Sequence, residues 1–205
     1  MNKKRAYKIF NLLKKHYPKA KIVLNYKNNF ELLVAVMLSA QTTDVQVNKT
    51  TANLFPKHRG KNEQVEIENF ANVNLKVLEN DIKQIGLYKT KAKNVKAAAK
   101  IILKDYNGKI PKTISELTLL PGVGRKTANV VLGNAYFIFE GVAVDTHVSR
   151  LSQKYGFSKE KSPEKIEKDL MNLFDKKIWF EITNLLIEHG RYIRKTKADF
   201  IESFL

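Results

Sequence analysis

The chain contains no cysteine among its 205 residues. Disulfide bonds, zinc sites built on thiolates and iron–sulfur clusters held by cysteine are therefore excluded. Long apolar runs are also missing, because no stretch approaches the ~20 residues that a membrane-spanning helix needs. The basic N-terminal segment MNKKRAYKIF is not followed by an apolar stretch of about 7–15 residues, so a secretory signal is not expected.

Several common catalytic and nucleotide-binding motifs are absent as well. The sequence has no Walker motif and no Rossmann G-x-G-x-x-G. His147 lies close to Asp145 and suggests a triad, but no G-x-S-x-G nucleophile elbow accompanies them. A zinc site is not expected, because no HExxH occurs and the four histidines are spread along the chain. These are His16, His58, His147 and His189.

Positive charge is abundant. Lysine and arginine number 37 against 20 acidic residues, which gives a net charge of +17. Such an excess favours a polyanionic partner, because each lysine or arginine that neutralises a phosphate releases counterions. One alternative is an anionic membrane surface, which would require a basic amphipathic helix with bulky apolar anchors. The other is a compositional bias toward Lys and Asn.

Apolar residues recur at helical spacing along most of the chain. Asn28 and Glu31 resemble a capping box that opens the segment FELLVAVMLSA. This segment is apolar on all sides and indicates a central buried helix, although a buried strand fits its periodicity too. Residues 89–106 form a clear amphipathic helix that stops at Asn107-Gly108.

The remaining segments complete an all-α prediction. Further helices are expected at 3–16, from 43 or 44 to 54, and at 74–84, 113–120, 125–136, 146–155, 163–174 and 176–189. Residues 55–72 have a weak pattern and are predicted to be a loop. Strand alternation, repeats and flexible linkers are not evident. The sequence therefore predicts an all-α fold of about ten helices joined by short turns.

The stretch LPGVGRKTANVVL, residues 120–132, places a Gly-x-Gly turn between two helical patterns. Glycine permits positive φ and lets the backbone approach a ligand closely. The amides of Gly122 and Gly124 would then point from a tight turn at a helix N-terminus, where phosphate binds well. An ordinary αα corner is the alternative, but Arg125 and Lys126 follow at once and favour phosphate binding.

Two residues offer chemistry as well as structure. Lys126 could hold a phosphate or act as a nucleophile, which requires the neutral amine that burial and a helix N-terminal dipole favour. Asp145 follows the apolar run Val142–Val144 and could cap a helix that begins at residue 146. The cap is the favoured interpretation from composition alone, but the same residue could also support charge development or move protons near the lysine. Spacing alone does not separate these roles.

The order of several motifs resembles the endonuclease III family of DNA glycosylases. LPGVGRKTANVVL is followed by VDTH, and three further stretches agree in the same order. They are LSAQTTDVQVNK at 38–49, IGLYKTKA at 85–92 and EHGRY at 188–192. The resemblance covers roughly residues 22–192, and the joint occurrence of these motifs is specific where each alone is not.

The resemblance implies an all-α, two-lobed helix–hairpin–helix DNA glycosylase fold. One lobe would be a six-helix barrel at residues 22–133, with the helix–hairpin–helix at about 113–133. The second lobe would join residues 1–21 to residues 134–205. The partner would be double-stranded DNA with a damaged base or an abasic site, bound by a monomer. The protein would be cytoplasmic, and associated with the nucleoid if the source is bacterial.

The resemblance also implies bifunctional chemistry. Lys126 matches the family's catalytic lysine and Asp145 its catalytic aspartate. An oxidised pyrimidine would be flipped out of the duplex and removed. The strand would then be cut 3′ to the lesion by β-elimination. Gln41 matches the residue that fills the hole left by the flipped base, and Leu87 the wedge on the opposite strand. From residue type alone, these two would be a helix-end polar residue and a core leucine.

The C-terminal region departs from the family pattern. The family follows HGRY with four cysteines that hold a 4Fe–4S cluster, whereas Arg194 stands at the first ligand position here and the cluster loop is absent. No cofactor and no metal are therefore expected. The basic residues of this region could replace the electrostatic contact of the cluster loop with DNA; they are Arg191, Arg194, Lys195 and Lys197. A non-catalytic helix–hairpin–helix protein or a decayed glycosylase is the alternative.

Overall fold

A computed structural model describes residues 2–204, which form α-helices and two short 3-10 helices, with no β-strand among them. The chain divides into two compact units. The continuous unit, Val23–Ile138, contains α2 (Asn29–Ser39), α3 (Asp44–His58), α4 (Glu63–Asn72), α5 (Leu75–Asp81), α6 (Tyr88–Tyr106), α7 (Ile114–Leu117) and α8 (Arg125–Tyr136). The split unit, Met1–Ile22 with Phe139–Leu205, contains α1 (Lys3–His16), α9 (Thr146–Lys154), α10 (Pro163–Leu173), η1 (Lys176–Ile178), α11 (Trp179–Thr196) and η2 (Glu202–Phe204).

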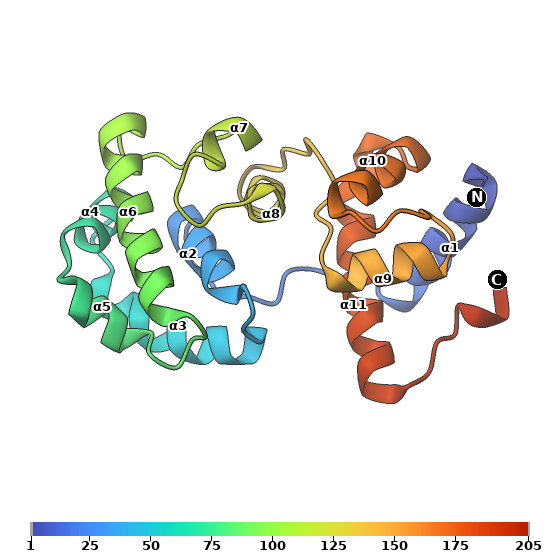
Figure 1. Cartoon of the computed structure of the whole chain (residues 1–205), viewed down its shortest axis with the longest axis horizontal. Helices are drawn as coiled ribbons and strands as arrows, with labels where there is room; N and C mark the ends of the chain where they lie inside the picture. The colour runs from blue at the N-terminus through green and yellow to red at the C-terminus, as the bar shows by residue number, and fades with distance from the viewer. Residues whose placement is uncertain (1, 205) are drawn as a thin grey trace. The chain divides into compact units, whose positions relative to one another are not determined.

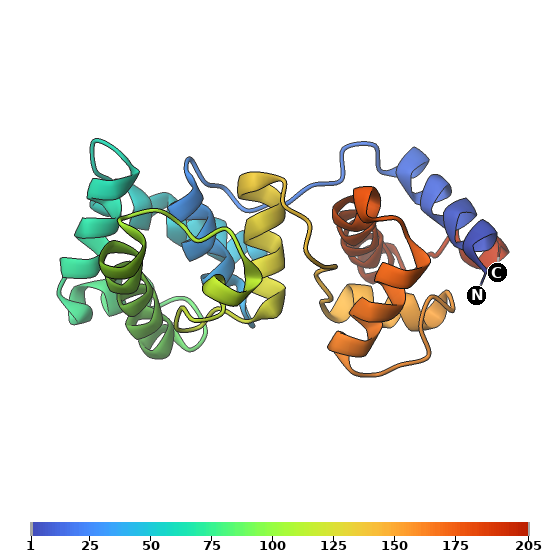
Figure 2. The same cartoon turned by 90° about the horizontal axis from the view of Figure 1, so that it is seen from above.

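Helix α2 forms the centre of the continuous unit. The Asn28 side chain accepts a hydrogen bond from the Glu31 backbone N–H at 2.8 Å, as a capping residue does. Every residue from Phe30 to Leu38 is buried. The helix packs against α3, α4, α6 and α8, and Figures 1 and 2 show it surrounded by them. The predicted central helix is confirmed, and the alternative of a buried strand is wrong.

The predicted loop at residues 55–72 is wrong, because most of it is helical. Helix α3 continues through Pro56, which lies in its last turn, and ends at His58. Helix α4 then begins after Asn62, whose side chain accepts from the Val65 N–H at 2.9 Å. Its pattern is hard to recognise because Glu66 is fully buried on the apolar face, where the Asn28 side chain donates to it at 2.7 Å.

The boundaries of the other helices follow their end signals. Helix α6 ends at Asn107 and Gly108, both with left-handed φ, as the Asn-Gly pair predicts. Helix α11 extends seven residues beyond the predicted end at 189 and stops at Lys197, which is also left-handed. No helix within residues 2–204 has the length and apolar character that would let it cross a bilayer.

The split unit has its own apolar core, to which both ends of the chain contribute. Helix α1 packs on α11, and α9 packs on α10 and α11. Fully buried side chains from these helices include Leu13, Leu151 and Leu186. Helix α1 lies near the C-terminal segment in Figure 1, and Lys8 Nζ lies 5.8 Å from the ring centroid of Phe204.

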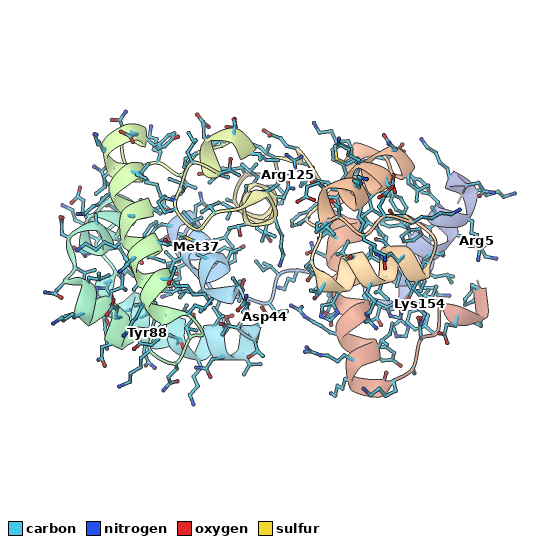
Figure 3. All side chains as sticks on the ribbon, in the orientation of Figure 1. Arg5, Met37, Asp44, Tyr88, Arg125 and Lys154 are labelled. Carbon is cyan, nitrogen blue, oxygen red and sulfur yellow. The ribbon has the colours of Figure 1, made fainter. Side chains whose placement is uncertain are left out.

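Asp199 anchors the residues that follow α11. Its carboxylate accepts hydrogen bonds from the Tyr155 hydroxyl at 3.0 Å and from the His189 ring at 2.9 Å, and it pairs with Lys154 Nζ at 2.7 Å. Lys154 is labelled on α9 in Figure 3. Burial alone would raise the pKa of Asp199, but the bonds from Lys154 and His189 outweigh it and hold this pKa below its usual value.

Candidate active site

The glycine-containing segment forms a turn between α7 and α8. The Val123 N–H donates to the Leu120 carbonyl at 3.0 Å, Gly122 adopts a φ of +79°, and Gly124 is the N-cap of α8. The first N–H groups of a helix have no acceptor within it and carry the positive end of the helix dipole. The hairpin therefore presents a backbone site suited to a phosphate.

The two glycines of the hairpin are needed for different reasons. A Cβ at Gly122 would lie 2.7 Å from Asn94 Nδ2 on α6, so this position requires glycine for space as well as for its φ. A Cβ at Gly124 would meet nothing within 4 Å. Gly122 thus seats the hairpin against α6, whereas Gly124 leaves open space at the N-terminus of α8.

Lys126 lies in the first turn of α8 with an exposed side chain. The partial burial that would favour a neutral amine is therefore not found. Arg125, labelled in Figure 3, precedes it and is also exposed. The amine of Lys126 is accessible to a ligand held at the hairpin.

Gln41 and Leu87 occupy two turns of the continuous unit in left-handed conformations. Their φ angles are +53° and +59°, which cost non-glycine residues about 1–2 kcal/mol each. Gln41 follows α2 and is exposed, and Leu87 is the N-cap of α6 with 62% of its surface exposed. Leu87 is therefore not a core leucine. Backbone strain of this kind persists only where the surrounding structure fixes the conformation.

Asp145 begins α9 in the split unit. Its Oδ1 accepts a hydrogen bond from the Val148 N–H at 2.8 Å, so the predicted N-cap is confirmed. The residues before it, Val142 to Val144, are buried and fix the backbone on that side. The Asp145 carboxylate is itself partly exposed. It therefore has one oxygen in the cap and remains accessible to a ligand.

Positive charge surrounds the beginning of α9. The pKa of His147 is lowered mainly by burial, with further lowering by Arg194, Arg150 and Arg191 and an opposing effect of Asp145. A Cβ at Gly190 on α11 would overlap the His147 ring, so glycine is what allows this approach. Sequence reasoning did not single out Arg150 or this contact; a glycine inside the helical EHGRY segment was the available signal.

Residues 34–176 match the HhH-GPD superfamily of base excision DNA repair proteins. Endonuclease III from Synechocystis is 43% identical over 191 residues, which cover 93% of this chain and 84% of that protein. Endonuclease III from Escherichia coli is 40% identical over 192 residues, which cover 94% of this chain and 88% of that protein.

Solved structures agree with this similarity. A trapped covalent intermediate of endonuclease III with DNA superposes with a TM-score of 0.89 at 40% identity, covering 99% of this chain and 92% of that one. A thermostable thymine-DNA glycosylase, at 19% identity and a TM-score of 0.80, shares the fold. The chain belongs to the HhH-GPD superfamily of base excision DNA repair proteins and, within it, to the endonuclease III family.

Proposed function

We propose that the protein is a base excision repair DNA glycosylase that also cleaves the strand at abasic sites. The observation that carries this proposal is the exposed Lys126 in the first turn of α8, directly after a glycine hairpin whose backbone suits a phosphate. The same chain is 40% identical to an endonuclease III that has been trapped covalently on DNA. Covalent attack on the sugar requires an accessible amine next to a bound DNA backbone.

The reaction follows from the nucleophile. Lys126 Nζ attacks C1′ of the damaged nucleotide, and the base leaves with the electrons of the glycosidic bond. The sugar ring opens to give a Schiff base between Nζ and C1′. Loss of a proton from C2′ then expels the 3′ phosphate by β-elimination, and hydrolysis of the imine frees Lys126.

The other site residues bind and orient. Asp145 would stabilise positive charge on the sugar or assist proton transfer, while its cap bond to Val148 holds the carboxylate in one orientation. Gln41 would fill the space left by the flipped base, and Leu87 would wedge into the opposite strand. The amides at Gly122 and Gly124, with Arg125, would hold the backbone next to the lesion. Arg191, Arg194 and Lys195 would add phosphate contacts.

We propose that the protein holds no iron–sulfur cluster. Such clusters are held by cysteine thiolates, and the chain has none, so its donor set does not fit the cluster that the family implies. Among residues 2–204, no three His, Asp or Glu side chains are grouped as a metal site would need. The hydrogen bonds of Asp199 instead hold the segment after HGRY on the split unit.

The finer features of the function are proposals too. We expect oxidised pyrimidines to be the preferred bases, duplex DNA with a damaged base or an abasic site to be the ligand, and a monomer to be the active form. A net charge of +17 supports a nucleic-acid partner rather than a small-molecule substrate. In a bacterial cell, we expect the protein to act on the nucleoid and not at a membrane.

Borohydride trapping tests the chemistry. The protein is incubated with a duplex that carries a natural abasic site, and borohydride reduces any Schiff base to a stable adduct seen by gel shift. Wild-type protein should form the adduct and Lys126→Ala should not. Lys100→Ala, which removes an exposed lysine from α6, should form it normally. Duplexes with thymine glycol, dihydrouracil or 8-oxoguanine then establish the base preference.

The result also separates the competing functions. Tight binding to the abasic duplex without an adduct would identify a non-catalytic helix–hairpin–helix protein or a decayed glycosylase. An adduct that persists in Lys126→Ala would refute the assignment of the nucleophile.

A further inference from the structure

Lys91 is a buried lysine whose ammonium group lies among three neutral acceptors. Only 6% of its surface is exposed. Its Nζ donates to the Leu38 carbonyl at 2.9 Å, to the Ala40 carbonyl at 2.5 Å and to the Thr42 hydroxyl at 3.1 Å. An ammonium group has three donors, so each is used once. Two of these partners, Ala40 and Thr42, flank Gln41 in the chain.

The backbone of Lys91 holds the other strained turn. Its N–H donates to the Leu87 carbonyl at 3.0 Å, which closes the first turn of α6. One residue therefore bonds to Leu87 through its backbone and to both neighbours of Gln41 through its side chain. Figure 3 labels Asp44 and Tyr88, which begin the helices that follow the two turns.

Two further contacts join the same turns. A Cβ at Gly86 would lie 3.4 Å from the Gln41 carbonyl oxygen and 3.7 Å from Thr42 Oγ1, so the two backbones are adjacent there. The Gln46 side chain donates to the Gln84 side chain at 3.0 Å. The two turns thus form one assembly, in which Lys91 is the buried link.

We propose that Lys91 is a positioning residue that holds Gln41 and Leu87 in the arrangement with which the protein distinguishes damaged from undamaged duplex. This inference rests on the proposed function, in which those two side chains enter the DNA. Both turns need an external restraint, because a left-handed φ at a non-glycine residue relaxes unless its surroundings fix it. A positioning error of about 1 Å is enough to lower activity roughly a hundredfold.

Lysine suits this task for electrostatic reasons. The Leu38 and Ala40 carbonyls lie at the C-terminal end of α2, where the helix dipole favours a cation. Burial lowers the pKa of Lys91, but only the ammonium form has three donors for the three acceptors. Methionine has a similar length and no donor, so Lys91→Met removes the three side-chain bonds that hold the backbone around Gln41. It keeps the backbone bond to the Leu87 carbonyl, so the turn at Leu87 loses only its link through Lys91 to the turn at Gln41.

Helix α6 itself offers a matched control. Lys96 also donates to a carbonyl at the end of a helix, that of Val73, which caps α4. Val73 lies outside both turns. Lys96→Met therefore removes one positive charge and one lysine–carbonyl bond from the same helix without releasing Gln41 or Leu87.

The test measures affinity for two duplexes of the same sequence. One carries a tetrahydrofuran abasic analogue, which cannot form a Schiff base, and the other is undamaged. The ratio of the two Kd values, from fluorescence anisotropy at fixed salt, is the preference for damage. Lys91→Met should lower this preference about tenfold or more and leave the Kd for undamaged duplex within about twofold of wild type. Lys96→Met should keep the wild-type preference.

A double-mutant cycle shows whether Lys91 acts through the two turns. In a Gln41→Ala/Leu87→Ala protein, adding Lys91→Met should not lower the preference further, because nothing remains to be positioned. Thr42→Val, which removes one acceptor, should give a smaller loss in the same direction. If Lys91→Met does not fold by circular dichroism, Thr42→Val with the same cycle becomes the test.

Three results would overturn the inference. They are an unchanged preference in Lys91→Met, an equal loss of affinity for both duplexes, and a further loss in the Gln41→Ala/Leu87→Ala background. Failure of the lyase function has a different signature, because wild-type protein would then give no borohydride adduct while the preference for the unreactive analogue still depended on Lys91.

Discussion

Replacing Gly122 with alanine perturbs the hairpin in two ways that the structure separates. The residue has a φ of +79°, and a left-handed conformation costs alanine about 1–2 kcal/mol. The new Cβ would also lie 2.7 Å from Asn94 Nδ2, 3.0 Å from its Cβ and 3.1 Å from its Cγ. Overpacking of this kind costs about 1–3 kcal/mol.

The net effect of Gly122→Ala should be a loss of about 2–4 kcal/mol in the free energy of unfolding, after the smaller entropy of the unfolded alanine chain offsets part of the two costs. Gly124→Ala is the control. Gly124 has a φ of −93° and nothing within 4 Å of a new Cβ, so its substitution should change the free energy of unfolding by only about 0.5 kcal/mol. Urea unfolding followed by far-UV circular dichroism measures both.

A third variant isolates the contact with α6. Asn94→Ala removes Nδ2 and Cγ but keeps the Cβ at 3.0 Å. In that background Gly122→Ala should therefore cost less than in wild type, with the conformational cost of about 1–2 kcal/mol as the lower limit. An unchanged urea midpoint in Gly122→Ala would refute the reasoning. A cost that is the same in the Asn94→Ala background would show that the contacts with Asn94 Nδ2 and Cγ contribute nothing.

Three further predictions concern the split unit. Asp145→Asn should keep the N-cap of α9 and unfold like wild type, whereas Asp145→Ala should lose about 1 kcal/mol; both should lose glycosylase activity, and wild-type activity in Asp145→Asn would contradict a role for the charge. Neutralising Arg191, Arg194, Lys195 and Lys197 to glutamine should flatten the plot of log Kd against log salt by about 0.9 per lost phosphate contact, and an unchanged slope would exclude these contacts. Burial lowers the pKa of His189 below 6.5 despite the opposing effect of Asp199. The stability that neutral His189 contributes is therefore complete above pH 6.5 and is lost as the pH falls toward the pKa of His189 in the folded protein. Urea unfolding at pH 7.0 and 5.5 measures this loss: the free energy of unfolding should decrease less between the two pH values in His189→Gln than in wild type. The pKa of His147 is also lowered, so part of the pH dependence of stability remains in both proteins.

Local signals in the sequence predicted most of the helices, because caps and apolar spacing act within a few residues. Asn28, Asn107 and Asp145 each mark a helix end that the structure confirms. The helix within 55–72 is not predicted, because a buried glutamate, Glu66, interrupts the apolar face of α4 and receives its side-chain hydrogen bond from Asn28, 38 positions away. A hydrogen bond between residues so far apart in the sequence does not appear in the spacing of apolar residues.

The candidate site was only partly accessible from sequence for the same reason. Exposed positions such as Lys126 and Leu87 are identified through motifs. The joint occurrence of these motifs in one order makes the resemblance to the family specific. No motif indicates a role for Lys91, although its spacing of four residues from Val95 places it on the apolar stripe of α6. Its meaning depends on three acceptors about 50 positions earlier in the chain. Sequence spacing on one helix does not reveal partners contributed by another.

The division of the chain has a consequence for its synthesis. All residues of the continuous unit leave the ribosome in one uninterrupted stretch, so this unit can fold as translation proceeds. Helix α1 is made before it but packs on α11, and Lys14 pairs with Glu181 across 167 positions. The apolar face of α1, with Ala6, Ile9, Phe10 and Leu13, therefore stays without its native partner until nearly the whole chain has been made. During that interval these side chains are apolar surface that is prone to aggregation.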